Sequence, residues 1–137
     1  MSNSCGLTSS VVIGGTISGG WATVGGVAYD TMSIHETQLQ YHTNCRSSNK
    51  VNTHTISCDE WNLLLNSVDI KEFNKLNIHT CNACVDGVDY SISIKTDTSY
   101  NKITFGKEYG ENSPIIKDLF AEIEKLRANY TNEICDK

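Results

Sequence analysis

The chain has 137 residues, of which 39% are hydrophobic and 20% are charged, and its formal net charge at pH 7 is −5. This balance excludes a disordered or fibrous chain, and the absence of a basic cluster argues against nucleic acid as a partner. No apolar run reaches the roughly 18 residues that a membrane helix needs, so we expect one globular domain with no transmembrane segment.

The amino-terminal third is rich in glycine and threonine and predicts short strands. Residues 11–13 and 21–24 form two apolar runs that glycine pairs interrupt, and a looser alternation over 29–41 indicates a further strand or a hairpin. Residues 44–54 are polar and without a period, which predicts a loop. Residues 1–9 are expected to be a flexible amino-terminal segment and 131–137 a tail of the same single domain, 1–137.

A helix is predicted over 57–68 because a capping box opens it. The Ser57 hydroxyl can accept a hydrogen bond from the Glu60 amide, while the Glu60 carboxylate accepts one from the Ser57 amide. Apolar residues then follow at helical spacing: Trp61, Leu64, Leu65 and Val68. A second short turn is expected at 73–76.

The second half predicts a hairpin and a longer helix. Apolar residues alternate with polar ones over 90–94 and again over 103–105, as expected for two strands with one wet face. Ser113 and Pro114 are typical of a helix start, and an apolar stripe continues to Leu126. The predicted fold class is α+β, an antiparallel sheet with two helices packed on one face.

The stretch "SGGWATVGG" at 18–26 is a candidate binding segment. It lacks the lysine and the following helix of a phosphate-binding loop, so nucleotide binding is not expected. Its glycines can serve bulges or close backbone approach, and a tryptophan between them can serve as an interface anchor. The predicted binding residues are Gly19, Gly20, Trp21 and Ala22.

Six cysteines are more than a cytosolic chain of this length usually carries, and they predict structural disulfides and an oxidising compartment. The candidates are Cys5, Cys45, Cys58, Cys81, Cys84 and Cys135. One arrangement pairs Cys81 with Cys84, Cys45 with Cys58, and Cys5 with Cys135, but the spacing does not fix the connectivity.

A zinc site is the alternative use of the same residues. His79, Cys81 and Cys84 would supply three ligands, and His54 or Cys58 the fourth. No HExxH or GxSxG pattern accompanies them. The sequence therefore argues against an enzyme, and no cofactor is expected.

The order of segments resembles emfourin, a family of small bacterial inhibitors of thermolysin-like metalloproteases. The resemblance rests on "SGGWA", "EWNLLLNSVDIKEFNKL", "DGVDYSISI", "ITF" and "SPIIKDLFAEIEKL", and it covers about 110 residues. The matching positions are Gly19, Gly20, Trp21, Leu64, Phe73, Leu76, Asp86, Tyr90, Ile92, Ile103, Pro114 and Leu119. A related pattern occurs in secreted Bacteroidetes-type domains of unknown function. The six cysteines and the polar stretch 45–54 depart from the emfourin pattern.

The expectation for function is therefore a secreted, periplasmic or outer-surface binding domain. Its partner would be a protein, and the resemblance implies an extracellular metalloprotease. A structural accessory protein of the cell envelope, anchored by lipid on Cys5, is a further alternative to the zinc domain.

Overall fold

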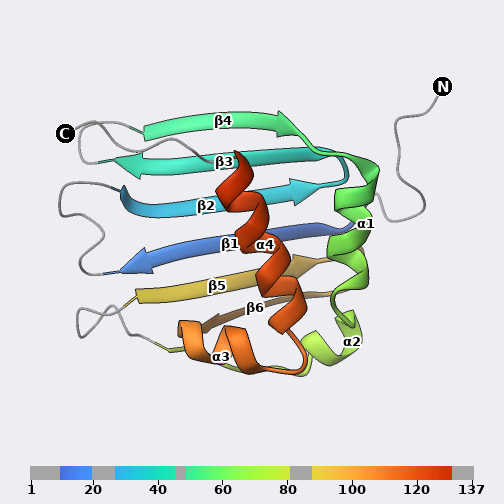
Figure 1. Ribbon diagram of the computed structural model, residues 1–137. Coiled ribbons are helices and arrows are strands. Elements are labelled where there is room, and N and C mark those ends of the chain that lie inside the picture. The colour runs from blue at the N-terminus through green and yellow to red at the C-terminus, as the bar shows by residue number, and fades with distance from the viewer. Residues whose placement is uncertain (1–9, 20–26, 46–48, 81–87, 131–137) are drawn as a thin grey trace.

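The computed structural model describes residues 10–19, 27–45, 49–80 and 88–130. Six strands form one antiparallel sheet in the order β4-β3-β2-β1-β5-β6 (Figure 1). Their bounds are β1 Val12–Gly19, β2 Val27–His35, β3 Gln38–Cys45, β4 Asn49–Thr55, β5 Val88–Lys95 and β6 Tyr100–Phe105. The predicted segments 1–9 and 131–137 lie outside the described residues.

The described part of the chain has four helices, whereas the sequence predicted two packed on one face. They are α1 Cys58–Asn66, α2 Ile70–Phe73, α3 Lys107–Asn112 and α4 Lys117–Tyr130. Figure 1 shows α4 running across the near side of the sheet, with α1 beside it and the two short helices below. The α+β class and the antiparallel sheet are confirmed. The number of helices is a correction.

The predicted capping box begins α1 as expected. The Glu60 amide donates to Ser57 Oγ at 3.0 Å, and the Ser57 amide donates to Glu60 Oε1 at 2.9 Å. These bonds satisfy two amides that have no partner inside the helix. The capping box thereby fixes the residue at which the helix begins. With this start, Trp61 and Leu64 lie on the side of the helix that faces the core, and both are fully buried.

The predicted carboxy-terminal helix begins three residues after its proline. Residues 114–116 form a turn, and the Lys117 amide donates to the Ser113 carbonyl at 2.9 Å. The apolar stripe is buried as predicted, at Ile116, Leu119, Phe120, Ile123 and Leu126. This stripe packs on the face of the sheet that carries Ile13, Met32, Ile34, Ile92, Ile94 and Ile103.

Two predictions about strands were wrong. The glycine pair Gly14–Gly15 does not interrupt β1. The strand continues through the pair because it is hydrogen-bonded to β2 on one side and to β5 on the other. A Cβ at Gly15 would lie 3.0 Å from Ile123 Cγ2, so the missing side chain lets α4 approach the sheet. The predicted loop at 44–54 contains β4, which pairs with β3 over its whole length.

Candidate binding surface

The sheet has one face beneath the helices and another that no described helix covers. Antiparallel partners point to the same side, so the register assigns each side chain to a face. Thr16 pairs with Thr31 and with Ser91, and Thr16 Oγ1 lies 3.5 Å from Thr31 Oγ1. These residues alternate with the buried apolar set, and we call their side the uncovered face.

Hydroxyl, amide and imidazole groups dominate the uncovered face. Its described residues come from all six strands. They are Val51, Thr53 and Thr55 of β4; Gln38, Gln40 and His42 of β3; Thr31, Ser33 and His35 of β2; Val12, Gly14 and Thr16 of β1; Ser91, Ser93 and Lys95 of β5; and Tyr100, Lys102 and Thr104 of β6. None of these is a carboxylate. Asp89 lies on the same face near the start of β5, but it is only 6% exposed, and it accepts a hydrogen bond from Thr80 Oγ1 at 2.7 Å.

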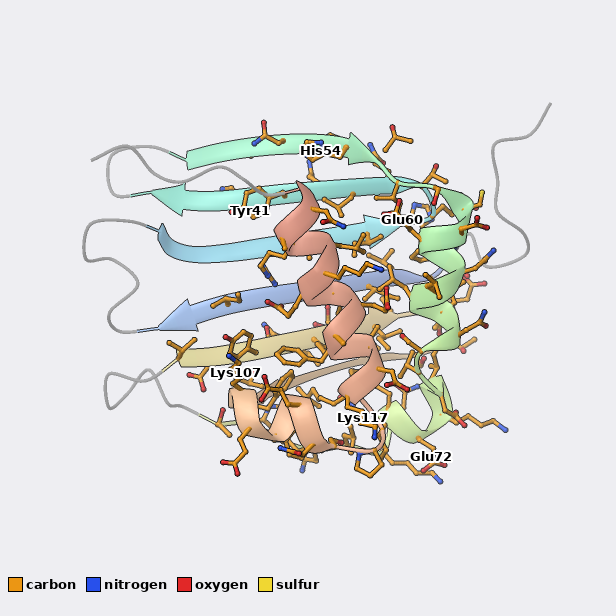
Figure 2. All side chains as sticks on the ribbon, in the orientation of Figure 1. Tyr41, His54, Glu60, Glu72, Lys107 and Lys117 are labelled. Carbon is orange, nitrogen blue, oxygen red and sulfur yellow. The ribbon has the colours of Figure 1, made fainter. Side chains whose placement is uncertain are left out.

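Most of the acidic side chains in the described part of the chain lie instead on the helices. They are Asp59 and Glu60 on α1, Glu72 on α2 with Asp69 at its cap, Glu108 and Glu111 on α3, and Asp118, Glu122 and Glu124 on α4. Figure 2 shows Glu60 and Glu72 on this helical side. A chain of net charge −5 thus keeps the described part of one broad face free of exposed carboxylates.

The predicted binding segment begins at the end of β1. Gly19 is the last residue of that strand and pairs with Val88. Gly20, Trp21 and Ala22 lie outside the described residues, so the prediction for Trp21 stays a prediction.

The zinc set that uses His54 is wrong, because the sheet separates its members. His79 forms an isolated bridge with Thr104 of β6, at one edge of the sheet, while His54 belongs to β4 at the other edge. Six strand spacings of about 4.8 Å put roughly 29 Å between them, far more than two ligands of one ion can span. Cys81 and Cys84 lie outside the described residues. Within the part of the chain that is described, no three His, Cys, Asp or Glu residues come close enough to hold a metal ion.

Cys58 is disulfide-bonded, which also removes its thiolate from the alternative zinc set. Its partner is not Cys45. The β3–β4 register places Cys45 just beyond the Asn44–Asn49 pair and Cys58 beyond the Gln38–Thr55 pair, at opposite ends of the hairpin. These two pairs are about 20 Å apart, whereas disulfide Cα atoms lie within about 7 Å. The side chains of the other five cysteines lie outside the description.

The described histidines do not form a catalytic cluster with one another. His42 pairs with Val51 and lies on the uncovered face, whereas His54 pairs with Leu39 and lies on the helical side. His35 ends β2, and His79 is exposed at the far edge. General acid–base chemistry by two of them at one substrate is therefore not favoured by this arrangement.

The sequence did not reveal the uncovered face as a site. A weak signal existed in the polar residues that alternate with apolar ones over 31–35 and 91–95. That alternation predicts a wet face for each strand but not that six such strands join into one surface, because the strand order depends on contacts between distant segments.

No protein family matches the chain, and no curated protein is similar to it at a significant level. Among the described residues, no helix is both long and apolar enough to pass through a membrane.

Proposed function

We propose that this protein is a non-catalytic, secreted binding domain that docks a protein partner on the uncovered face of its sheet. The observation that carries the proposal is the segregation of charge. The described uncovered face has Lys95, Lys102 and two histidines and no exposed carboxylate, on a chain whose net charge is −5. A neutral or acidic surface can approach it without the repulsion that the acidic helices would impose.

The size of the face suits a protein partner. Five strand spacings and about six residues along each strand give roughly 24 by 20 Å, or about 500 Å². This is more than half of the roughly 800 Å² that one partner contributes to an interface of standard size.

Its chemistry also suits recognition. Threonine, serine and glutamine side chains both donate and accept hydrogen bonds, so they can pair with either kind of group on a partner. Val51 on β4 and Tyr100 on β6 are exposed at opposite edges, and Tyr100 is 62% exposed. Tyrosine is enriched at protein interfaces because it combines an apolar ring with a polar tip.

An oxidising compartment is part of the proposal. The disulfide at Cys58 supports it, since such bonds are rare in proteins of the reducing cytosol. The resemblance to emfourin makes a thermolysin-type metalloprotease the first partner to test.

A site-specific cross-linking experiment tests the docking surface. A genetically encoded benzophenone amino acid replaces exposed Gln40 on the uncovered face or, as the matched control, exposed Asn62 on α1. Irradiation in cultures of the source organism should give one discrete adduct from position 40 that excess unmodified protein abolishes, and none from position 62. Identical adducts from both positions, or no adduct from position 40, would overturn the proposal.

An inhibition assay tests the protease version separately. Thermolysin activity should fall as the protein is titrated to micromolar concentration, and Gln40→Glu should weaken inhibition about tenfold or more because it places a carboxylate on the uncovered face. Asn62→Glu adds the same charge on the helical side and should change nothing. Unchanged thermolysin activity at micromolar protein removes the inhibitor version, and the cross-linking result then decides the general proposal.

A further inference from the structure

A pocket of about 350 Å³ lies between α3 and α4, on the helical side of the molecule. Its walls include Tyr90 at the start of β5, Phe120 and Glu124 on α4, and Lys107 and Glu111 on α3, with Lys117 at the first residue of α4. Figure 2 shows Lys107 and Lys117 at the beginnings of the two helices. Its volume is at the small end of the range for ligand sites.

One wall of this pocket is a fixed aromatic cluster. The Phe120 ring meets the Tyr90 ring edge-on, with centroids 5.2 Å apart, and meets Phe105 in the same way at 5.4 Å. Gly110 packs against Phe105 and Phe120 so closely that even a Cβ would clash with both rings. The wall is therefore preformed, and an aromatic or apolar group could pack on it without first ordering these side chains.

The charged side chains at the rim of the pocket differ in whether they have an ion-pair partner and in how exposed that pair is. Glu124 Oε2 lies 3.2 Å from Nε of Arg127, a guanidinium that is largely buried. Lys107 Nζ lies 3.9 Å from Glu111 Oε2, and both side chains are more than half exposed, so water screens that pair. Within the described residues, no carboxylate lies within 4.0 Å of Lys117 Nζ, and the Tyr90 hydroxyl makes no hydrogen bond.

We propose that this pocket binds a carboxylate attached to an aromatic or apolar group. The ring would pack on Tyr90 and Phe120, and the carboxylate would pair with the Lys117 ammonium, the cation that lacks an acidic partner. Lys107 would also pair with the ligand carboxylate, and its weak ion pair with Glu111 would break. Two sources have this chemistry: a free arylalkyl carboxylate, and the carboxy-terminal aromatic residue of a peptide.

Titration followed by amide chemical shifts in NMR tests the site. The probes are 3-phenylpropionate and an N-acetylated tripeptide that ends in phenylalanine, each compared with its carboxamide. For ligands this small, saturation is expected below about 10 mM. The shifts should centre on residues 107–124. Saturation by the free acid identifies a small molecule as the source, and saturation by the peptide alone identifies a peptide end.

Matched lysine variants test the assigned cation. Lys117→Met keeps an unbranched side chain of similar length and removes the ammonium charge, and it should weaken binding of either carboxylate about tenfold. Lys125→Met makes the same change at an exposed position on α4 away from the pocket and should leave the affinity unchanged. The proposal is overturned if neither acid saturates, if the carboxamides bind as tightly, or if the two variants behave alike. This result is independent of the cross-linking at Gln40, so either proposal can fail alone.

Discussion

Glu36 has a backbone conformation that its side chain disfavours. Its φ is 55°, and among the described non-glycine residues it alone has a positive φ. It begins the two-residue connection between β2 and β3, which the His35–Gln38 pair closes. Such hairpin turns require positive φ at their first central residue, where glycine is preferred. Its Oε2 atom is also buried and accepts no hydrogen bond.

Glu36→Gly should therefore stabilise the protein. Relief of the left-handed strain outweighs the greater freedom of glycine in the unfolded chain, and we expect a gain of about 0.5–1 kcal/mol in the free energy of unfolding. Urea denaturation monitored by tryptophan fluorescence measures it. Thr37→Gly is the control, because that residue has no positive φ to relieve and should lose stability. A loss for both variants would contradict the assigned turn.

Local chemistry explains which residues the sequence could assign. Ser57 and Glu60 were predicted because both partners of the capping box lie within one turn, and the structure confirms both hydrogen bonds. Glu36 could not be predicted, since the sequence of this turn lacks the glycine that usually marks it. Similarly, the requirement at Gly15 comes from Ile123, a residue distant in the sequence.

Helix α3 depends on packing more than on helical propensity. It has six residues, Gly106 caps it with no side-chain hydrogen bond, and a glycine occupies its interior. Such a segment has little helical tendency of its own. Gly110 is buried where Phe105 and Phe120 meet, and this close approach fixes the helix against the sheet.

Gly110→Ala consequently tests which of two opposing effects dominates. In an exposed helix this change adds roughly 1 kcal/mol of stability. Here the new Cβ would lie 2.6 Å from Phe105 Cε2 and 2.9 Å from Phe120 Cδ2, so we expect a net loss of about 1–3 kcal/mol. Thermal and urea unfolding measure the change, with Asn62→Ala at an exposed position of α1 as the control. Equal or higher stability of Gly110→Ala would show that α3 is not held by this contact.

The same reasoning separates the elements that were predicted from those that were missed. Helix α1, the β5–β6 hairpin and the stripe of α4 have strong local periods, and all three were predicted. Strand β4 was missed because it lies at the sheet edge, where Asn52 and His54 replace apolar residues on the helical side. Helix α3 was missed because six residues with a glycine show no period.

At the scale of the whole molecule, the sheet register restricts the covalent connectivity. Cys58 lies at the end of the β3–β4 hairpin opposite to Cys45, so its disulfide must join another part of the chain. We predict that, after digestion with trypsin and chymotrypsin together, the peptide that contains Cys58 is not linked to residues 42–46, the peptide that contains Cys45 and is separated from Cys5 by cleavage after Tyr41. Mass spectrometry of a non-reduced digest, with a reduced digest as the reference, measures this. A Cys45–Cys58 linkage would show that the register is wrong.

The uncovered face also exists only at this scale. Ser33 and Ser93 flank Gly14 from two strands that are far apart in the sequence. Composition indicates an acidic chain but not that most of its described carboxylates lie on the helical side. The acidic helices and the polar sheet face each follow local rules, and only the strand order places them on opposite sides.

The position of β1 has a consequence for the route by which the chain folds. Strands β1 to β4 are neighbours both in the sequence and in the sheet, as are β5 and β6. Pairing within each group can therefore start at the short connections between consecutive strands. The two groups meet only along β1 and β5, where Ile13 opposes Ile94 across some 80 intervening positions. Closing so long a loop costs more conformational entropy than closing the short turns. We therefore expect the pairing of β1 with β5 to limit the rate of folding.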